Sequence, residues 1–170
     1  RHAKIYYRDS DGQPTGELEN YLYALKPLRA LYGGTLAEEF GPLALAAVRD
    51  AMIRQGWTRK RINLQIGRIK HVFKWAGEKE LIGGGVWHNL QTLSGLKAGR
   101  SEAKDAPPVV PVAESRVRAI LPFVTPTIAA IIELQLLTGA RPGEILAMRT
   151  GDIDTSGHVW IYRPGSHKTA

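Results

Sequence analysis

Arg141 and Glu144, three positions apart, are the residues whose types and spacing are best suited to chemistry. Gly139 suits the left-handed position just past the end of one helix, and Pro142 suits the first turn of the next. The pattern therefore predicts Arg141 at a helix N-terminus, where backbone N–H groups and a guanidinium together favour a phosphate group. Glu144 is close enough to hold the guanidinium in place. The alternative interpretation is a structural Arg–Glu pair at a corner between two helices.

A second set of candidate residues lies on a helix that we expect to begin after Thr58 and to end at Gly77. One apolar stripe repeats at helical spacing along it: Ile62, Ile66, Ile69, Phe73 and Ala76. An adjoining arc and the first turn carry the candidate DNA-binding residues: Arg59, Lys60, Arg61, Lys70, His71 and Lys74. Cations in a first turn oppose the helix dipole by about 0.3–1 kcal/mol each, so an anionic partner such as a phosphate backbone would explain them. A solvated basic face is the alternative.

The composition of the 170-residue chain supports a polyanionic partner, because Lys and Arg number 23 against 16 Asp and Glu, a net charge of +7. We expect nucleic acid first and an anionic membrane second. The chain has no cysteine, which excludes disulfides, thiolate metal sites and thiol nucleophiles and fits an intracellular, cytoplasmic, nucleoid-associated protein. The chain contains no run of about eighteen apolar residues, so we expect no membrane span. We expect no metal, no cofactor and no small-molecule substrate.

The elements that position these residues are predicted to be mainly helical. Residues 1–17 form an N-terminal arm or short hairpin, 18–98 a helical domain, 99–112 a linker, and 113–170 a second domain. In the first domain, Pro27 is expected to kink or split a helix, and Pro42 to Arg54 reads as another helix. In the second domain, an apolar helix spans 128–137, and 158–162 reads as a strand pairing with 167–170.

The run Thr138-Gly139-Ala140-Arg141-Pro142-Gly143-Glu144-Ile145 resembles the first arginine box of the tyrosine recombinase (phage integrase) family, which reads roughly T-G-x-R-x-x-E-[IL]. The continuation to Asp152-Ile153-Asp154 is also similar to that family, where such a segment leads into a β-strand. The resemblance implies a four-helix-type core-binding (SAM-like) domain, then the first part of a mixed α/β catalytic domain with a short β-hairpin.

The same resemblance implies DNA strand exchange through a 3′-phosphotyrosyl intermediate, without metal or cofactor, by a tetramer on double-stranded DNA. It assigns Arg141 to the phosphate clamp, Glu144 to support of that arginine, and Lys168 to proton donation to the leaving oxygen. An exposed hairpin lysine is the alternative for Lys168. The family's H-x-x-R box and nucleophilic tyrosine belong further along than this chain extends, so we expect it to bind DNA without cleaving it. Tyr162 is expected to pack or to face DNA.

Two other functions remain open at this point. A non-catalytic DNA-binding module of the same architecture would keep the basic residues without the chemistry. A helical protein-interaction domain would use its charge only for solubility. The arginine box favours the recombinase over the first of these, and the basic arc favours DNA binding over the second.

Overall fold

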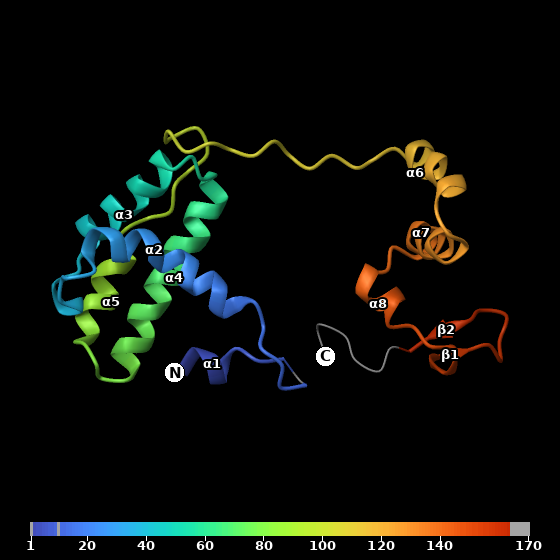
Figure 1. Ribbon diagram of the computed structural model, residues 1–170, viewed down its shortest axis with the longest axis horizontal. Helices are drawn as coiled ribbons and strands as arrows, with labels where there is room; N and C mark the ends of the chain where they lie inside the picture. Colours follow the sequence, from blue (N-terminus) through green and yellow to red (C-terminus); the bar gives the residue numbers. More distant parts are fainter. Residues whose placement is uncertain (1, 10, 164–170) are drawn as a thin grey trace. The chain divides into compact units, whose positions relative to one another are not determined.

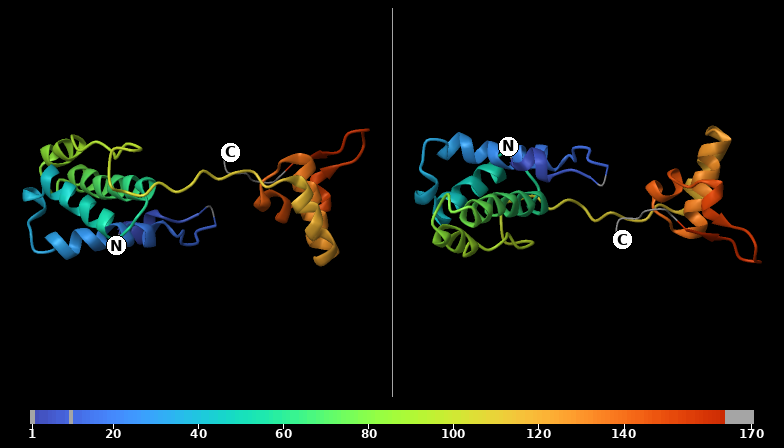
Figure 2. Two further views of the ribbon diagram at one scale, coloured as in Figure 1. Left: turned by 90° about the horizontal axis from the view of Figure 1, so that it is seen from above. Right: turned by 90° about the horizontal axis from the view of Figure 1, so that it is seen from below.

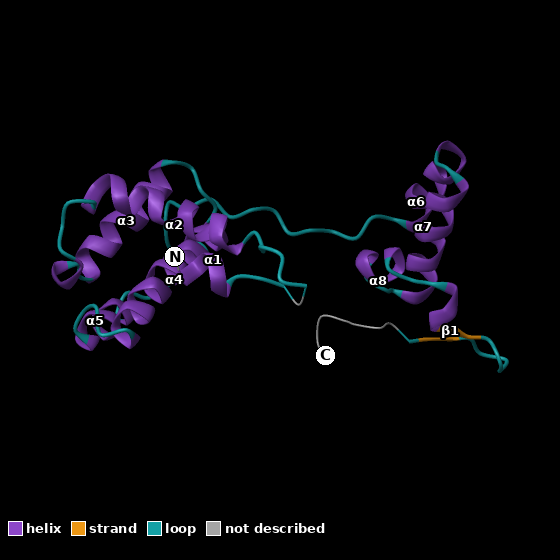
Figure 3. Cartoon of the chain, turned by 60° about the horizontal axis from the view of Figure 1, so that its bottom comes forward, coloured by secondary structure: helices purple, strands orange, loops and turns teal. Residues whose placement is uncertain are grey.

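The computed structural model describes residues 2–9 and 11–163 and divides the chain into two compact units, before and after Pro108. Both units are built mainly from helices, and a single pair of short antiparallel strands lies in the second unit within the described residues (Figures 1 and 3). The expectation of a mainly helical chain with a small amount of strand is therefore confirmed. None of the helices in these ranges is long and apolar enough to cross a membrane.

The first unit is organised around α4, which contacts α2, α3 and α5 (Figure 2). Its helices are α1 (His2–Tyr6), α2 (Glu17–Tyr32), the 3-10 turn η1 (Ala37–Glu39), α3 (Pro42–Arg54), α4 (Arg59–Glu78) and α5 (Gly84–Gln91). The predicted apolar stripe of α4 faces inward, and four of its five residues are buried: Ile62, Ile66, Ile69 and Phe73. Helices α3 and α4 supply most of the fully buried side chains, with Leu90 of α5.

Pro27 was expected to kink or split a helix, and it does not split α2. Helix α2 runs without interruption from Glu17 to Tyr32, and the Pro27 side chain is buried. A proline in a helix interior removes one backbone hydrogen bond, and burial of its apolar ring offsets part of that loss.

The N-terminal arm contains a short helix and a tight turn. Helix α1 is followed by a turn in which the Asp9 carboxylate accepts the N–H groups of Asp11 and Gln13, and Thr15 N donates to the Tyr7 carbonyl at 3.0 Å. The predicted hairpin is reduced to one isolated bridge, Arg8 with Pro14. Aromatic residues of the arm stack on α2 and α4, so this segment packs against the helices.

The first part of the predicted linker belongs to the first unit. Lys104 forms a parallel bridge with Thr58, and its carbonyl accepts the N–H of Arg59 at 2.8 Å. Ala103 is buried in the core. Thr58 occupies the predicted N-cap position of α4, but its side chain makes no capping bond. A carbonyl of the linker therefore satisfies one of the backbone donors that a helix N-terminus leaves unpaired.

The second unit contains short helices and the two strands. They are α6 (Glu114–Ile120), η2 (Leu121–Phe123), α7 (Pro126–Thr138), α8 (Pro142–Leu146), η3 (Thr150–Asp152), β1 (Ile153–Asp154) and β2 (Ile161–Tyr162). The Thr125 hydroxyl caps α7 by accepting the Ile128 N–H at 3.4 Å. The strands pair antiparallel, with Ile153 opposite Tyr162. Strand β2 falls inside the predicted strand 158–162, and its expected partner 167–170 lies outside the described residues.

Helix α3 carries one buried and one exposed leucine, which allows the contribution of the core to stability to be tested. Leu45 is fully buried, whereas Leu43 on the same helix is 89% exposed. We expect Leu45→Ala to lower the free energy of unfolding by about 2–5 kcal/mol, because it leaves a cavity, and Leu43→Ala to change it by less than about 0.5 kcal/mol. Urea denaturation of both variants measures the difference. Equal losses would show that α3 does not pack by this face.

Candidate nucleic-acid interface

The corner between α7 and α8 has the backbone geometry that the sequence predicts. Gly139 ends α7 in the left-handed region with φ 66°, and its N–H donates to the Gln135 carbonyl. Arg141 is the N-cap residue of α8, in an extended conformation, and Pro142 follows in the first turn. Helix α8 spans five residues, so its dipole adds little to any anion site here. The charge available at this corner is that of the arginine itself.

Glu144 holds Arg141 through both of its carboxylate oxygens. The Arg141 guanidinium donates from Nη1 to Oε1 at 3.0 Å, and the Arg141 backbone N–H donates to Oε2 at 3.1 Å. The Arg141 side chain is 61% exposed, against 27% for Glu144. The glutamate therefore fixes one edge of the guanidinium and leaves much of the fork accessible to solvent, where it can donate hydrogen bonds to an anion.

Tyr162 connects the strands to this corner. Its hydroxyl donates to the Glu144 carbonyl at 3.0 Å, and its side chain is partly buried. Beside it, Arg163 pairs with Asp154 at 3.2 Å. Hydrogen bonds from Ser156, and to a smaller extent one from Arg163, hold the pKa of Asp154 below its ordinary value. The tyrosine thus positions α8 through its hydroxyl, and the adjacent cation is already paired. Lys168, the third predicted catalytic residue, lies outside the described residues.

Two residues of the predicted basic arc on α4 hold the first unit together. Arg59 Nε donates to Asp105 Oδ1 at 2.7 Å, and Lys70 Nζ donates to the Leu93 carbonyl at 2.7 Å. Burial, followed by the nearby charge of Arg49, lowers the pKa of Lys70 below its ordinary value. Both side chains therefore bind the segment that follows α5, and neither is freely available to a phosphate backbone.

Asn63, which the sequence analysis did not single out, completes this attachment. Its side-chain amide donates to the Leu96 carbonyl at 2.9 Å, and Leu96 N donates to its Oδ1 at 2.8 Å. A Cβ at Gly95 would lie 3.4 Å from the Asn63 amide, so the loop approaches closely where glycine stands. Asn63 lies four residues after Arg59 and seven before Lys70. Its helical spacing was visible in the sequence, but the loop that it binds was not.

The other members of the predicted set differ in how freely they face solvent. His71 Nδ1 is hydrogen-bonded to the Tyr21 hydroxyl, and Lys74 pairs with Glu78 at 3.5 Å. The Arg61 guanidinium lies over the ring of Tyr23 at 4.7 Å. A second ring, that of Trp57, lies 5.0 Å from the same guanidinium. Among the described residues, neither Arg61 nor the exposed Lys60 has an acidic partner. Lys60 and Arg61 are thus the most accessible cations of the set.

No metal site is found where the structure describes the chain, because no three His, Asp or Glu side chains gather there. Comparison with protein-family models, with curated proteins and with solved structures finds no match to this chain.

On the flank of α4 that faces α2, Arg68 forms an ion pair with Glu17, and we expect this pair to weaken at acidic pH. Arg68 donates to both Glu17 oxygens, Nε to Oε1 at 2.9 Å and Nη2 to Oε2 at 3.1 Å. The hydrogen bond from Arg68 is the main cause that lowers the pKa of Glu17 from 4.5, against a smaller opposing effect of burial. A carboxylate with a lowered folded-state pKa stabilises the fold above its unfolded pKa and loses that contribution as the pH falls.

We therefore expect Arg68→Met to destabilise the protein at neutral pH and to cost progressively less below about pH 4.5, as Glu17 becomes protonated. Thermal unfolding of the wild type and the variant between neutral pH and roughly pH 3 measures the difference. Arg29→Met, on an exposed position of α2, is the control and should show no such trend. A loss for Arg68→Met that is constant with pH would mean that the ion pair contributes nothing.

Proposed function

We propose that this chain is the DNA-binding part and the first portion of the catalytic domain of a site-specific tyrosine recombinase. The observation that carries the proposal is the exposed Arg141 guanidinium, fixed along one edge by Glu144 at the corner between α7 and α8. The residues of that corner are those whose sequence resembles the family's first arginine box. No match to the family supports the proposal, so it depends on this geometry and on the motif.

In the proposed reaction, a tyrosine of the full-length protein attacks a phosphodiester, and a 5′-hydroxyl leaves. Negative charge then develops on the non-bridging oxygens, and a fixed guanidinium at Arg141 stabilises it. Glu144 keeps the guanidinium oriented, which reduces the entropy lost on binding. Lys168 is assigned the transfer of a proton to the leaving 5′-oxygen. No metal or cofactor takes part in this proposal.

The first unit is proposed to bind the double-stranded DNA on which that reaction takes place. Its accessible cations on α4, Lys60 and Arg61, would contact phosphates, with Lys74 available when Glu78 releases it. Arg59, Lys70 and His71, which the sequence included in this set, are proposed to act mainly through the fold. Self-association on DNA and a location beside the nucleoid belong to the same proposal.

A protein-interaction function is the second candidate, because the second unit exposes large apolar side chains. They include Phe123, Leu137, Leu146 and Trp160, and α7 has no buried residue among those described. Exposure of large apolar side chains in this number is typical of a surface that another segment or subunit covers. The recombinase proposal accounts for it as the surface that the remainder of a catalytic domain would cover.

DNA binding by Lys60 can be tested with a charge-matched control. We expect duplex affinity to fall with salt, and Lys60→Glu to weaken binding and to lower the slope of log K against log salt by about 1, because one phosphate contact is lost. Arg29→Glu, on an exposed position of α2, makes the same change in net charge and should leave the slope unchanged. Fluorescence anisotropy at several salt concentrations measures both. Affinity for duplex that does not change with salt would contradict the nucleic-acid proposal.

Tyr162 is expected to form no covalent link to DNA. Its hydroxyl donates a hydrogen bond to the Glu144 carbonyl, and its side chain is partly buried. The hydroxyl is therefore not accessible to an incoming phosphate. Incubation of the chain with a nicked suicide duplex, followed by denaturing electrophoresis, should show no protein–DNA adduct. An adduct that maps to Tyr162 by peptide mass would overturn this assignment.

A further inference from the structure

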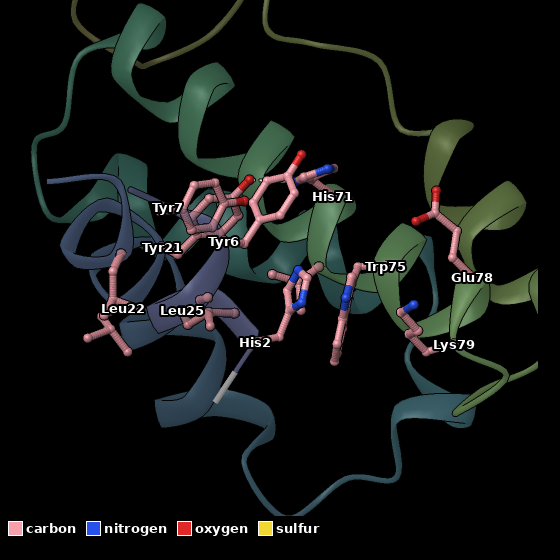
Figure 4. A pocket seen from close by; sticks show the side chains of 13 residues that line it. His2, Tyr6, Tyr7, Tyr21, Leu22, Leu25, His71, Trp75, Glu78 and Lys79 are labelled. Carbon is pink, nitrogen blue, oxygen red and sulfur yellow. Dashed lines mark hydrogen bonds between the residues drawn. The ribbon is translucent and has the colours of Figure 1, made fainter. Parts of the chain in front are cut away.

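A cavity of about 410 Å³ lies in the first unit between α1, α2 and α4 (Figure 4). Its walls contain six aromatic rings: His2, Tyr6, Tyr7, Tyr21, His71 and Trp75. Its volume falls within the range of about 300–1,000 Å³ that is usual for small-ligand sites. None of the residues that line it is one of the proposed DNA contacts Lys60, Arg61 and Lys74.

Several of the rings in this cavity are stacked nearly parallel. His2 lies between Tyr6 and Trp75, with ring centroids 5.2 Å and 5.1 Å apart and interplanar angles of 24° and 28°. Tyr7 stacks on Tyr21 at 5.2 Å and 26°. Flat ring faces in this arrangement are the surfaces on which proteins stack planar aromatic ligands, including nucleic-acid bases.

Three polar groups around the rings are suited to the edge of such a ligand. The Trp75 Nε1–H is buried and has no acceptor among the described residues. Glu78 and Lys79 also line the cavity and supply a carboxylate acceptor and a cation. An aliphatic anchor from a peptide would cover the rings but would leave the buried Trp75 N–H without an acceptor.

The Tyr21 hydroxyl adds no negative charge to the cavity. Burial, followed by a hydrogen bond with Tyr7, raises the pKa of Tyr21 well above its ordinary value, so its hydroxyl stays neutral at physiological pH. Tyr21 and His71 also line a second groove of about 290 Å³, together with Arg68 of α4 and its acidic partner Glu17. The cation of that groove is already paired, so Lys79 is the exposed cation that the cavity itself offers.

We propose that this cavity binds an unpaired nucleobase, which stacks on the aromatic rings while Lys79 contacts its phosphate. The proposal rests on the proposed DNA-binding function and adds a preference for DNA with an unpaired base. His2 lies on α1, which has no buried residue, so this wall of the cavity can move to admit a base.

The test compares two duplexes of equal length that carry the fluorescent base aminopurine, either fully paired or as a single unpaired bulge. We expect the bulged duplex to bind about 5- to 100-fold more tightly, with quenching of its fluorescence, because one stacked base supplies affinity of that order. His2→Ala and Trp75→Leu should remove most of this preference, and Trp75→Phe should retain part of it. Trp87→Leu, a tryptophan of α5 that does not line the cavity, is the matched control and should keep it.

His2→Ala keeps the test decisive if Trp75→Leu fails to fold, since His2 is exposed on a short helix. Equal affinity for both duplexes, with normal salt dependence, would overturn this inference and leave the proposed function standing. Failure of both duplexes to bind would overturn both. A change in oligomeric state on His2→Ala, without any effect on quenching, would assign the cavity to a second copy of the chain and reject the nucleobase.

Discussion

The burial of one side of α4 against three other helices is the constraint on which the first unit depends. Ile62, Ile69 and Phe73 fix the rotation of α4, and that rotation decides what every other side chain on it can reach. One flank meets α2 and carries Arg68, and the other meets the loop after α5 and carries Asn63. The residues between these flanks, including Lys60, are left to solvent. The apolar stripe of α4 therefore determines both which of its polar side chains bind other parts of the first unit and which face solvent.

The elements predicted best from sequence are those whose signals are local. Helix α3 begins at Pro42 and ends at Arg54 as predicted, because an N-terminal proline and a following Gly56 mark both ends. Gly139 adopts the left-handed conformation that its place after α7 requires. Pro27 does not split α2, and its side chain is buried, which is a property of the packed unit. Local rules describe helix ends well and describe the consequences of packing poorly.

The candidate sites differ in the same way. Arg141 and Glu144 are close in sequence, so their pairing could be predicted from spacing and is observed. The basic arc of α4 was correct as a pattern, but Arg59 and Lys70 bind groups that lie far along the chain, at Asp105 and Leu93. Helical periodicity identifies which residues share a face without identifying what covers that face. Because of these distant partners, Arg59 and Lys70 are assigned a structural role in place of the predicted ligand-binding one.

The attachment of Lys104 to Thr58 shortens the tether between the two units. With Asp105 held by Arg59, the chain that is free to extend runs only from residue 106 to residue 113, before α6 begins. At about 3.3–3.6 Å per residue, these roughly eight residues can span no more than about 29 Å, whereas the fourteen residues of the predicted linker could span about 50 Å. A shorter tether raises the effective concentration of one unit near the other, so binding of the first to a ligand would strongly favour engagement of the second on the same molecule.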